Sequence, residues 1–369
     1  MPKLKLLHII HSFDVGGLEN GLVNLINHLD PERYAHEVCC IATSGPMASR
    51  LERPVIIHEL GKGASDKSYQ LPLKLAGLIR SSVPDIVHTR NWGTIDGITG
   101  ARLAGVKKIV HGEHGREASD PHGKNRKRKI IRKLISPAIS RFVPVSADLN
   151  DWLINDIKVP AKKVYLIING VDMSKFEPAV DKHALRRRLG LAEDCPLIGI
   201  VGRLDPVKDH ATLIKAFAKV SGLAQLIIVG DGPMRQSLQS IVGELKLTDR
   251  TVFLGTRNDV ADILGALDVF VLPSIAEGIS NTILEAMSSG LPVVASRVGG
   301  NPELVADNTT GVLFEPGDHE HLTRILSNYI TNQGLTRQHG QAGRKRVEDE
   351  FSLEIMVQKY DELYSSLMI

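Results

Sequence analysis

The amino-acid sequence predicts an α/β protein built from two doubly wound parallel sheets in tandem. Three observations lead to this prediction. The chain has 369 residues, which is enough for two domains of about 150 residues each. Short apolar runs rich in Val and Ile recur at intervals that can each hold a helix, a pattern typical of parallel strands covered on both faces. These runs form two series, one in each half of the chain.

In the first half, the apolar runs predict strands at residues 4–10, 37–42, 55–60, 85–88, 108–111, 142–146 and 164–168. In the second half, they predict strands at residues 197–201, 225–229, 252–254, 269–273, 292–295 and 312–314. The two domains are expected to span residues 1–178 and 179–351. A last helix over residues 352–369 has apolar positions at helical spacing, so we expect it to pack on another element.

Composition and charge exclude several classes of protein. With 43% hydrophobic and 24% charged residues, the chain is neither disordered nor fibrous. No apolar run approaches the ~18 residues that a membrane-spanning helix needs. The three cysteines have no metal-binding or redox spacing, which favours a reducing compartment. The net charge is only +3, yet residues 121–147 carry eight basic side chains and no acidic one.

This basic segment leaves two interpretations open. On a helical wheel, residues 126–139 place the apolar side chains on one half and most charges on the other. Either the apolar half packs on the sheet and the charges are merely solvated, or the charges contact an anionic membrane surface. The residues available for membrane or acceptor contact are Lys124, Arg126, Arg128, Lys129, Arg132 and Lys133. Nucleic acid is disfavoured, because no aromatic residues are interleaved with the charges.

Loops that follow strands are where open parallel sheets bind ligands. After the first strand, Gly16 and Gly17 fit either a tight strand–helix turn or a close approach of the backbone to a ligand. After the first strand of the second domain, Arg203 and Lys208 could hold a diphosphate or could be ordinary solvated charges.

The segment at residues 273–287 is more specific. It places Glu277 in a loop, starts a helix near Ser280 or Asn281, and puts Glu285 about one turn into that helix. The first-turn amides of a helix favour a phosphate, and carboxylates accept hydrogen bonds from sugar hydroxyls. Glu285 could equally do no more than stabilise the helix terminus.

These motifs resemble those of a known family. Glu277 and Glu285 lie within EGISNTILEAMSSGLPVVAS, which resembles the signature of glycosyltransferase family 4. The resemblance covers nearly the whole chain. Its further motifs are Gly16-Gly17, the stretch with Gly202, Arg203 and Lys208, VGDGP at residues 229–233 and GGNPE at residues 299–303.

The resemblance implies a GT-B fold, in which two Rossmann-like domains face each other across a cleft and the last helix completes the first domain. It implies retaining transfer of a sugar from a UDP- or GDP-sugar to a glycan or lipid-linked acceptor, with no metal and no further cofactor. HGEHGRE at residues 111–117 is also similar to sugar transferases of exosortase-type exopolysaccharide systems. The expected setting is therefore cell-surface glycan synthesis by a cytoplasmic protein, peripheral at the inner face of the plasma membrane.

The resemblance also implies roles for individual residues. Arg203 and Lys208 match the pair that holds the donor diphosphate. Glu277 matches the residue that holds donor-sugar hydroxyls, and Glu285 matches the ribose-binding carboxylate. His114 matches a histidine beside the transferred sugar, although a purely structural histidine also fits there. Further donor contacts fall on Gly16, Gly17, Arg257, Gly278, Ile279, Ser280, Asn281 and Thr282.

The donor preference is not carried over, because Ile279 replaces a frequent aromatic residue and Ser280 a frequent Gly or Pro. The expected reaction is a front-face displacement, in which the acceptor hydroxyl attacks as the diphosphate leaves. Its catalytic residues would be His114, Arg203, Lys208 and Glu277. Two alternatives stay open: a nucleotide-sugar epimerase on the same fold, and a catalytically silent protein that binds a nucleotide sugar.

Overall fold

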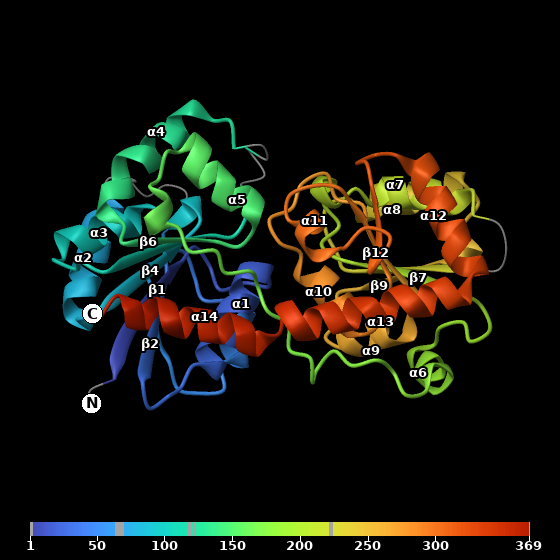
Figure 1. Cartoon of the computed structure of the whole chain (residues 1–369), viewed down its shortest axis with the longest axis horizontal. Helices are drawn as coiled ribbons and strands as arrows, with labels where there is room; N and C mark the ends of the chain where they lie inside the picture. The colour runs from blue at the N-terminus through green and yellow to red at the C-terminus, as the bar shows by residue number, and fades with distance from the viewer. Residues whose placement is uncertain (1–2, 63–69, 117–119, 121–122, 221–223, 369) are drawn as a thin grey trace. The chain divides into compact units, whose positions relative to one another are not determined.

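The computed structural model describes residues 3–62, 70–116, 120, 123–220 and 224–368. The chain divides into two compact units, which are described separately (Figure 1). Unit 1 comprises Met1–Asn169 with Glu354–Ile369, and unit 2 comprises Gly170–Leu353. Glu117 of the HGEHGRE motif and the first two positions of the basic segment lie outside the described residues.

Unit 1 contains a sheet of six parallel strands in the order β3-β2-β1-β4-β5-β6. The strands are β1 (Leu4–Ile10), β2 (Tyr34–Cys40), β3 (Ile56–Glu59), β4 (Ile86–Arg90), β5 (Ile109–Glu113) and β6 (Arg141–Pro144). The parallel sheet predicted for the first half is therefore confirmed. The seventh predicted strand, residues 164–168, is wrong, because Val164 makes only a single bridge to Phe142 at the edge of β6.

The helices of unit 1 are α1 (Gly17–His28), α2 (Leu71–Ser82), α3 (Asp96–Leu103), α4 (Arg126–Ile135), α5 (Ala147–Asp151) and α14 (Leu353–Ser366). The last helix, α14, packs on the strands of unit 1 through buried tyrosines. The Tyr364 hydroxyl lies 2.7 Å from His88 Nδ1. From β2, the Tyr34 hydroxyl donates to Asp361 Oδ1 at 2.6 Å.

Unit 2 contains a second sheet of six parallel strands, in the order β12-β11-β10-β7-β8-β9. Its strands are β7 (Leu197–Val201), β8 (Gln225–Val229), β9 (Thr251–Gly255), β10 (Val269–Leu272), β11 (Val293–Ser296) and β12 (Gly311–Phe314). All six lie at or near the apolar runs of the sequence, because strands buried on both faces need continuous apolar side chains.

Helices cover both faces of the unit 2 sheet (Figure 1). One layer consists of α7 (His210–Ala218), α8 (Arg235–Glu244) and α12 (His319–Thr331). The other consists of α6 (Lys182–Leu189), α9 (Val260–Ala266), α10 (Asn281–Ser288) and α13 (Gln333–Glu350). A short helix, α11 (Asn301–Leu304), follows β11. Among the described helices, none is both long enough and apolar enough to cross a bilayer.

The order of the strands determines where each sheet can bind a ligand. In unit 1 the chain reverses its direction of winding between β1 and β4, and in unit 2 between β7 and β10. Loops that leave the carboxyl ends of such neighbouring strands diverge to opposite faces, which opens a crevice between them. The loops after β7 and β10 carry Arg203, Lys208 and Glu277.

Candidate active site

Two predicted site residues meet at the switch point of unit 2. Lys208 Nζ lies 2.6 Å from Glu277 Oε1, and the Ser274 hydroxyl donates to the same oxygen at 2.6 Å. The Glu277 side chain is 9% exposed and that of Lys208 is 23% exposed, so a partly buried ion pair faces the carboxyl edge of the sheet. Sequence reasoning did not assign a role to Ser274, which is buried at the end of β10.

The loop that carries Lys208 is fixed by its own polar residues. Asp205 Oδ1 accepts hydrogen bonds from the backbone N–H groups of Val207 (3.1 Å) and Lys208 (3.2 Å), which shapes a single 3₁₀ turn. The N–H of Ile275 donates to the Val207 carbonyl at 2.8 Å. This bond joins the loop after β7 to the loop after β10, and it holds Lys208 beside Glu277.

Arg203 stands at the carboxyl end of β7 with its side chain exposed. Its loop is held by glycines in the VGDGP motif. A Cβ on Gly230, which has a φ of +127°, would lie 2.0 Å from the Gly202 carbonyl oxygen. Only glycine permits this approach, so the motif brings the loop after β8 against the loop that presents Arg203.

The GGNPE motif supports the Glu277 loop in the same way. Gly299 has a φ of +49°, and a Cβ there would lie 2.0 Å from the Glu277 carbonyl oxygen. The N–H of Gly300 donates to the Gly278 carbonyl at 2.9 Å. The motif is recognisable in the sequence but this contact is not, because the spacing of residues does not show which loops pack together.

The helix after the Glu277 loop begins as predicted. Ser280 is the N-cap of α10 and its hydroxyl accepts from the N–H of Ile283 at 3.3 Å. Asn281 and Thr282 form the first turn of the helix and are half-buried, and Glu285 lies just beyond that turn. Two of the donor contacts expected from the resemblance are enclosed, since Ile279 is 8% exposed and Ser280 is 4% exposed.

Arg257 follows β9 and is already paired. Its Nε donates to Asp259 Oδ1 at 2.7 Å and its Nη2 to Asp259 Oδ2 at 2.5 Å. A nucleotide base could therefore reach only the N–H groups that Asp259 leaves available. Nothing in the sequence indicates that Arg257, a predicted donor contact, is held by Asp259 in this way.

In unit 1, Gly16 and Gly17 lie at the carboxyl end of β1. Gly16 is the N-cap of α1, and Gly17 is the first residue of the helix. The Glu19 side chain folds back over Gly16, with its Oε2 only 2.2 Å from where a Cβ would stand. Burial raises the pKa of Glu19, and a backbone hydrogen bond offsets part of this increase. The loop is thus a tight strand–helix turn as well as an exposed backbone surface.

His114 directly follows β5, and its N–H donates to Asn91 Oδ1 at 2.7 Å. Both ring nitrogens are enclosed and have no hydrogen-bond partner among the described residues. Burial and then the nearby Arg90 guanidinium lower the pKa of His114 to about 3. The imidazole is therefore neutral at physiological pH, and the described residues leave the hydrogen-bonding capacity of its two ring nitrogens unused.

The structure corrects the expectation for Arg132. Its side chain is 3% exposed and donates to both carboxylate oxygens of Glu113, at 2.7 and 3.2 Å. The carboxylate is 1% exposed and the Arg132 guanidinium, together with His111, lowers the pKa of Glu113 to about 2 against the effect of burial. Arg132 is thus excluded from any membrane surface, because the buried Glu113 requires a cation beside it.

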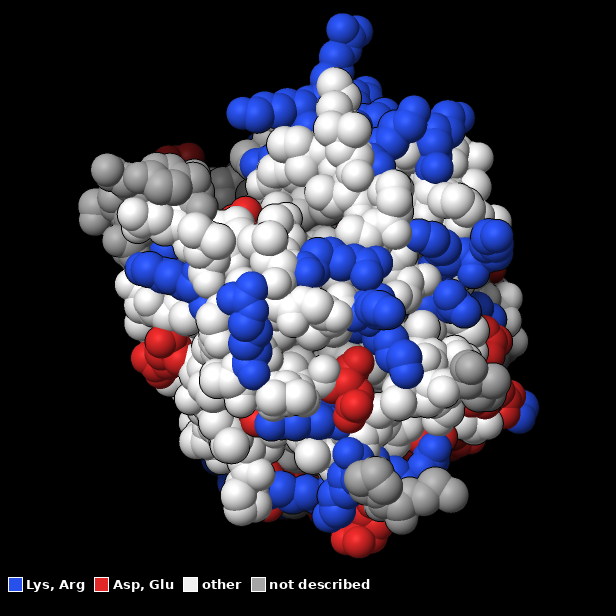
Figure 2. All heavy atoms as spheres, turned by 90° about the vertical axis from the view of Figure 1, so that its left-hand side faces the viewer, with Lys and Arg blue, Asp and Glu red and all other residues white. Residues whose placement is uncertain are grey.

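The expected orientation of the basic helix is wrong for two of its apolar residues, whereas Ile131 and Ile135 are half-buried and Ile139 is buried. On α4, Ile130 is 58% exposed and Leu134 is 73% exposed, although the wheel placed both toward the sheet. Around them, Lys124, Arg126 and Lys133 are exposed, as the sequence indicated. The remaining two predicted contacts are engaged within unit 1: Arg128 lies over the Trp92 ring at 5.4 Å, and Lys129 forms an ion pair with Asp156. Figure 2 views the molecule from the left-hand side of Figure 1 and shows Lys and Arg gathered at the top, where α4 lies.

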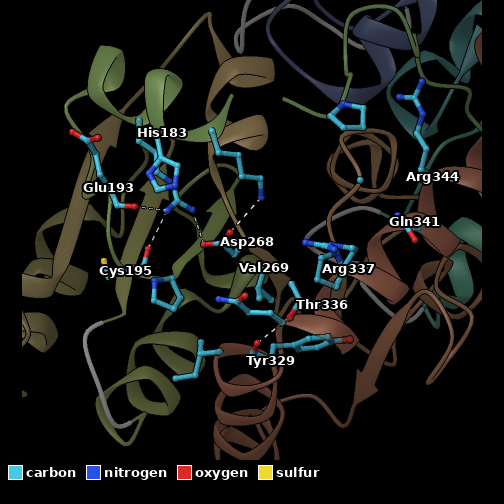
Figure 3. A pocket seen from close by; sticks show the side chains of 18 of the residues that line it. His183, Glu193, Cys195, Asp268, Val269, Tyr329, Thr336, Arg337, Gln341 and Arg344 are labelled. Atoms are coloured by element: carbon cyan, nitrogen blue, oxygen red, sulfur yellow. Dashed lines mark hydrogen bonds and ion pairs between the residues drawn. The ribbon is translucent and has the colours of Figure 1, made fainter. Parts of the chain in front are cut away.

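A cavity of about 830 Å³ lies at the opposite, amino edge of the unit 2 sheet (Figure 3). Cys195 and Pro196 precede β7, and Asp268 precedes β10. Its buried cation, Arg186, donates to Asp268 Oδ2 at 2.6 Å and to three backbone carbonyls. None of the predicted site residues lines this cavity.

The described residues contain no group of three or more His, Cys, Asp or Glu side chains placed to hold a metal ion. The family descriptions that match the chain are Glycosyltransferase Family 4 at residues 15–175 and Glycosyl transferases group 1 at residues 181–346. The first match falls in the first predicted domain and the second in the second.

Individual relatives show the same similarity. The UDP-Gal:alpha-D-GlcNAc-diphosphoundecaprenol alpha-1,3-galactosyltransferase of Escherichia coli is 30% identical, over 100% of this chain and 98% of its own length. A GDP-mannose-dependent alpha-mannosyltransferase of Mycobacterium tuberculosis is 30% identical over 83% of this chain and 82% of its own. Among solved structures, Anabaena HepE in complex with UDP and glucose has a TM-score of 0.86 at 24% identity, covering 98% and 100% of the two chains.

The solved structure shows the fold, with two Rossmann-like units in one chain. The two relatives are both glycosyltransferases that use a nucleotide sugar. Because a 30% identical relative spans the entire chain and both family descriptions match in order, this chain belongs to glycosyltransferase family 4 and is a nucleotide-sugar glycosyltransferase of the GT-B fold.

Proposed function

We propose that the chain catalyses retaining, metal-independent transfer of a sugar from a UDP- or GDP-sugar to a lipid-linked or glycan acceptor. The observation that carries the proposal is the pair of Lys208 and Glu277 at the switch point of unit 2, with Arg203 exposed on the same loop as Lys208. The cations offer N–H donors to a diphosphate, and the carboxylate accepts from sugar hydroxyls. These are the two parts of a nucleotide sugar that meet at the bond to be broken.

The other site residues of unit 2 would complete the donor site. The first turn of α10, with Gly278 and Ile279 before it, presents backbone N–H groups and the positive end of the helix dipole to a phosphate. Glu285 would accept from the ribose hydroxyls, and Arg257 would contact the base with its remaining N–H groups. The named relatives act with UDP-Gal or GDP-mannose, which supports a nucleotide sugar without selecting between the two bases.

In the proposed reaction, the bond between the sugar C1 and the diphosphate oxygen breaks as the acceptor oxygen bonds to C1 on the same face. The acceptor proton passes to a phosphate oxygen of the leaving group. Arg203 and Lys208 stabilise the negative charge that develops there, which is the role that a metal ion plays in other transferases. Neutral His114 in unit 1 hydrogen-bonds the transferred sugar and, with its low pKa, is not the proton donor.

A turnover assay tests this proposal. Wild-type protein is incubated with a panel of UDP- and GDP-sugars, with and without a polyprenyl diphosphate-linked sugar, and the product is examined by NMR. We expect one donor to give an acceptor-dependent product with the anomeric configuration of the donor. Conversion of the donor without acceptor would favour the epimerase, and donor binding without any product would favour the silent binder. An inverted product would contradict the retaining mechanism.

We also propose that the acceptor is met at an anionic membrane surface, at the inner face of the plasma membrane, in exopolysaccharide or related cell-surface glycan synthesis. The support is the outward face of α4, where Ile130 and Leu134 stand among Lys124, Arg126 and Lys133. Basic residues near an anionic bilayer contribute ~1 kcal/mol each, and an apolar side chain that leaves water adds roughly 1.5–3 kcal/mol. Together these terms favour peripheral attachment.

Vesicle sedimentation measures this attachment. With vesicles of phosphatidylcholine and 30% phosphatidylglycerol chosen as the probe, the double variant Arg126→Glu/Lys133→Glu should bind at least tenfold more weakly than wild type. The matched control, Arg324→Glu/Arg337→Glu, changes the charge equally on exposed residues of unit 2 and should bind like wild type. Equal binding by both double variants would contradict the assignment of α4.

A further inference from the structure

Arg132 lies at the centre of a buried cluster that joins α4 to the active-site edge of unit 1. Its guanidinium binds both oxygens of Glu113, and the two side chains are 3% and 1% exposed. It also lies 5.0 Å from the Trp92 ring centroid and 5.0 Å from that of Trp152. A planar guanidinium can stack on aromatic rings while its N–H groups bind a carboxylate, which an ammonium does less well.

Two short pieces of chain, which we call arms, connect this cluster to the same residue, His114. The first arm is Glu113 and the second is Trp92–Asn91. In the first, Glu113 is the last residue of β5 and is bonded covalently to His114. In the second, Trp92 follows Asn91 in the chain, and Asn91 Oδ1 accepts the N–H of His114 at 2.7 Å. Arg132 contacts Glu113 in the first arm and Trp92 in the second, so it touches the chain on both sides of the His114 backbone.

The second arm is held in a strained conformation. Asn91 has a φ of +57°, in the left-handed region that non-glycine residues seldom adopt. Its N–H donates to the Gly112 carbonyl at 2.8 Å, which ties the loop after β4 to β5. Such conformations persist where the surroundings impose them, and here the neighbouring Trp92 packs against two arginines, Arg128 and Arg132.

Stability alone does not account for the ion pair. Replacing a buried salt bridge with apolar side chains of similar volume is often neutral or stabilising, because desolvation of two charges offsets their attraction. On an amphipathic helix with Ile130 exposed, an apolar residue at position 132 would be a simpler way to attach α4. The pair instead gives a directional, two-point contact between α4 and the end of β5.

We propose that Arg132 is a positioning residue that holds His114 in place through Glu113 and through Trp92–Asn91, and that it thereby links α4 to the reaction. The inference rests on the proposed function, in which His114 contacts the transferred sugar and α4 contacts the membrane. Arg132 itself touches no substrate. Its removal should displace the imidazole while the donor site of unit 2 stays intact.

A double-mutant cycle between positions 132 and 114 tests this inference. Arg132→Lys should lower kcat by about 10- to 100-fold, the effect expected when a reacting group shifts by about 1 Å, while the KM for the donor changes less than twofold. In a His114→Ala background, where residual transfer is followed with radiolabelled donor, Arg132→Lys should lower the rate less than twofold. The matched control, Arg80→Lys, alters an exposed arginine of unit 1 and should match wild type.

Several results would overturn the inference. Equal losses in the wild-type and His114→Ala backgrounds would show that Arg132 acts independently of His114, and no loss in either would show that it has no part in the reaction. Wild-type rates in His114→Ala alone would remove the residue through which Arg132 is said to act. If Arg132→Lys fails to fold, Asn91→Ala cuts the second arm without touching the ion pair and should show the same dependence on His114. Absence of transfer by the wild type would instead reject the proposed function, before any variant is compared.

Discussion

The two units share one sheet topology but hold their polar groups differently. In unit 2, the charged groups stand on loops beyond the strands, where Arg203 is exposed and Lys208 and Glu277 are partly accessible. In unit 1, polar side chains lie inside the strands, and His88 and Arg90 of β4 are 0% and 2% exposed. The charged groups of unit 2 are therefore open to solvent at the carboxyl edge of its sheet, whereas polar groups of unit 1 are enclosed within its strands.

The chemical consequence is a difference in protonation. Burial lowers the pKa of four histidines in unit 1, and the buried Arg90 guanidinium lowers each of them further. The pKa of His36 falls to about 4 and that of His114 to about 3. The pKa values of His8 and His88 lie well below the usual range. In the described part of unit 2, the pKa is lowered for His210, to about 4, and for His339. Acid should thus affect unit 1 more strongly than unit 2.

The largest predicted effect is acid destabilisation of unit 1. A histidine whose pKa is lowered by folding takes up its proton mainly in the unfolded chain. Its neutral form therefore costs no stability above pH 6.5, and the free energy of unfolding decreases as the pH falls below that value. At pH 5 each such histidine costs up to about 2 kcal/mol. Both tryptophans, Trp92 and Trp152, lie in unit 1. Urea unfolding followed by tryptophan fluorescence should show a midpoint that falls steeply between pH 7.5 and pH 5.

The control for this prediction is the pH dependence of the unfolding free energy in a histidine variant. His36→Gln removes one titrating group, and should reduce the slope of unfolding free energy against pH between pH 6 and pH 5 by about one proton. A fluorescence midpoint that does not change from pH 7.5 to pH 5 would contradict the neutral histidine interior of unit 1.

A smaller effect is expected where unit 2 relies on glycine. Gly299→Ala places a Cβ 2.0 Å from the Glu277 carbonyl oxygen, at a φ of +49°. The strain and overlap should reduce stability by about 1–3 kcal/mol and weaken donor binding, because the Glu277 loop must shift. Gly243→Ala in α8 is the matched control, since a Cβ there meets nothing within 4 Å and should stabilise the helix. Calorimetric titration with donor and urea unfolding measure both; unchanged values for Gly299→Ala would refute the contact.

The smallest effect concerns the outward face of α4. Ile130→Ser and Leu134→Ser should each change the free energy of unfolding by less than about 0.5 kcal/mol, because both side chains are already in water. Leu75→Ala on α2, where the side chain is 0% exposed, should cost about 2–5 kcal/mol and serves as the buried reference. A cost above about 2 kcal/mol for either Ser variant would mean that the replaced side chain is buried and would contradict its outward position on α4.

The fold was predictable because its signal is local. Continuous apolar runs such as residues 197–201 and 225–229 are what a strand covered on both faces requires, and they correspond to β7 and β8. The place of the proposed unit 2 site was also predictable, because Arg203, Lys208 and Glu277 lie in loops that follow apolar runs and carry a recognisable motif. The pairing of Lys208 with Glu277 needed the structure, since 69 residues separate them.

The polar interior of unit 1 was not predictable in this way. A helical wheel predicts the buried face of α4 from hydrophobicity alone. It contains no information about a buried carboxylate on another element, and here Glu113 binds Arg132 on the buried side of the helix. His8 and His88 occupy positions within strands where sequence patterns indicate only a short interruption of apolar residues. Their partners come from other strands and from α14, so long-range contacts decide their role.

The turnover of Arg203→Ala decides our proposal that the loops at the switch point of unit 2 hold the leaving diphosphate. The side chain is exposed, so its removal should leave the melting temperature unchanged. We expect kcat to fall by about 10²- to 10³-fold, as for loss of one preorganised donor to a developing negative charge. Arg337→Ala, an exposed arginine at the opposite edge of unit 2, should retain wild-type turnover. Near-wild-type turnover by Arg203→Ala would contradict the account.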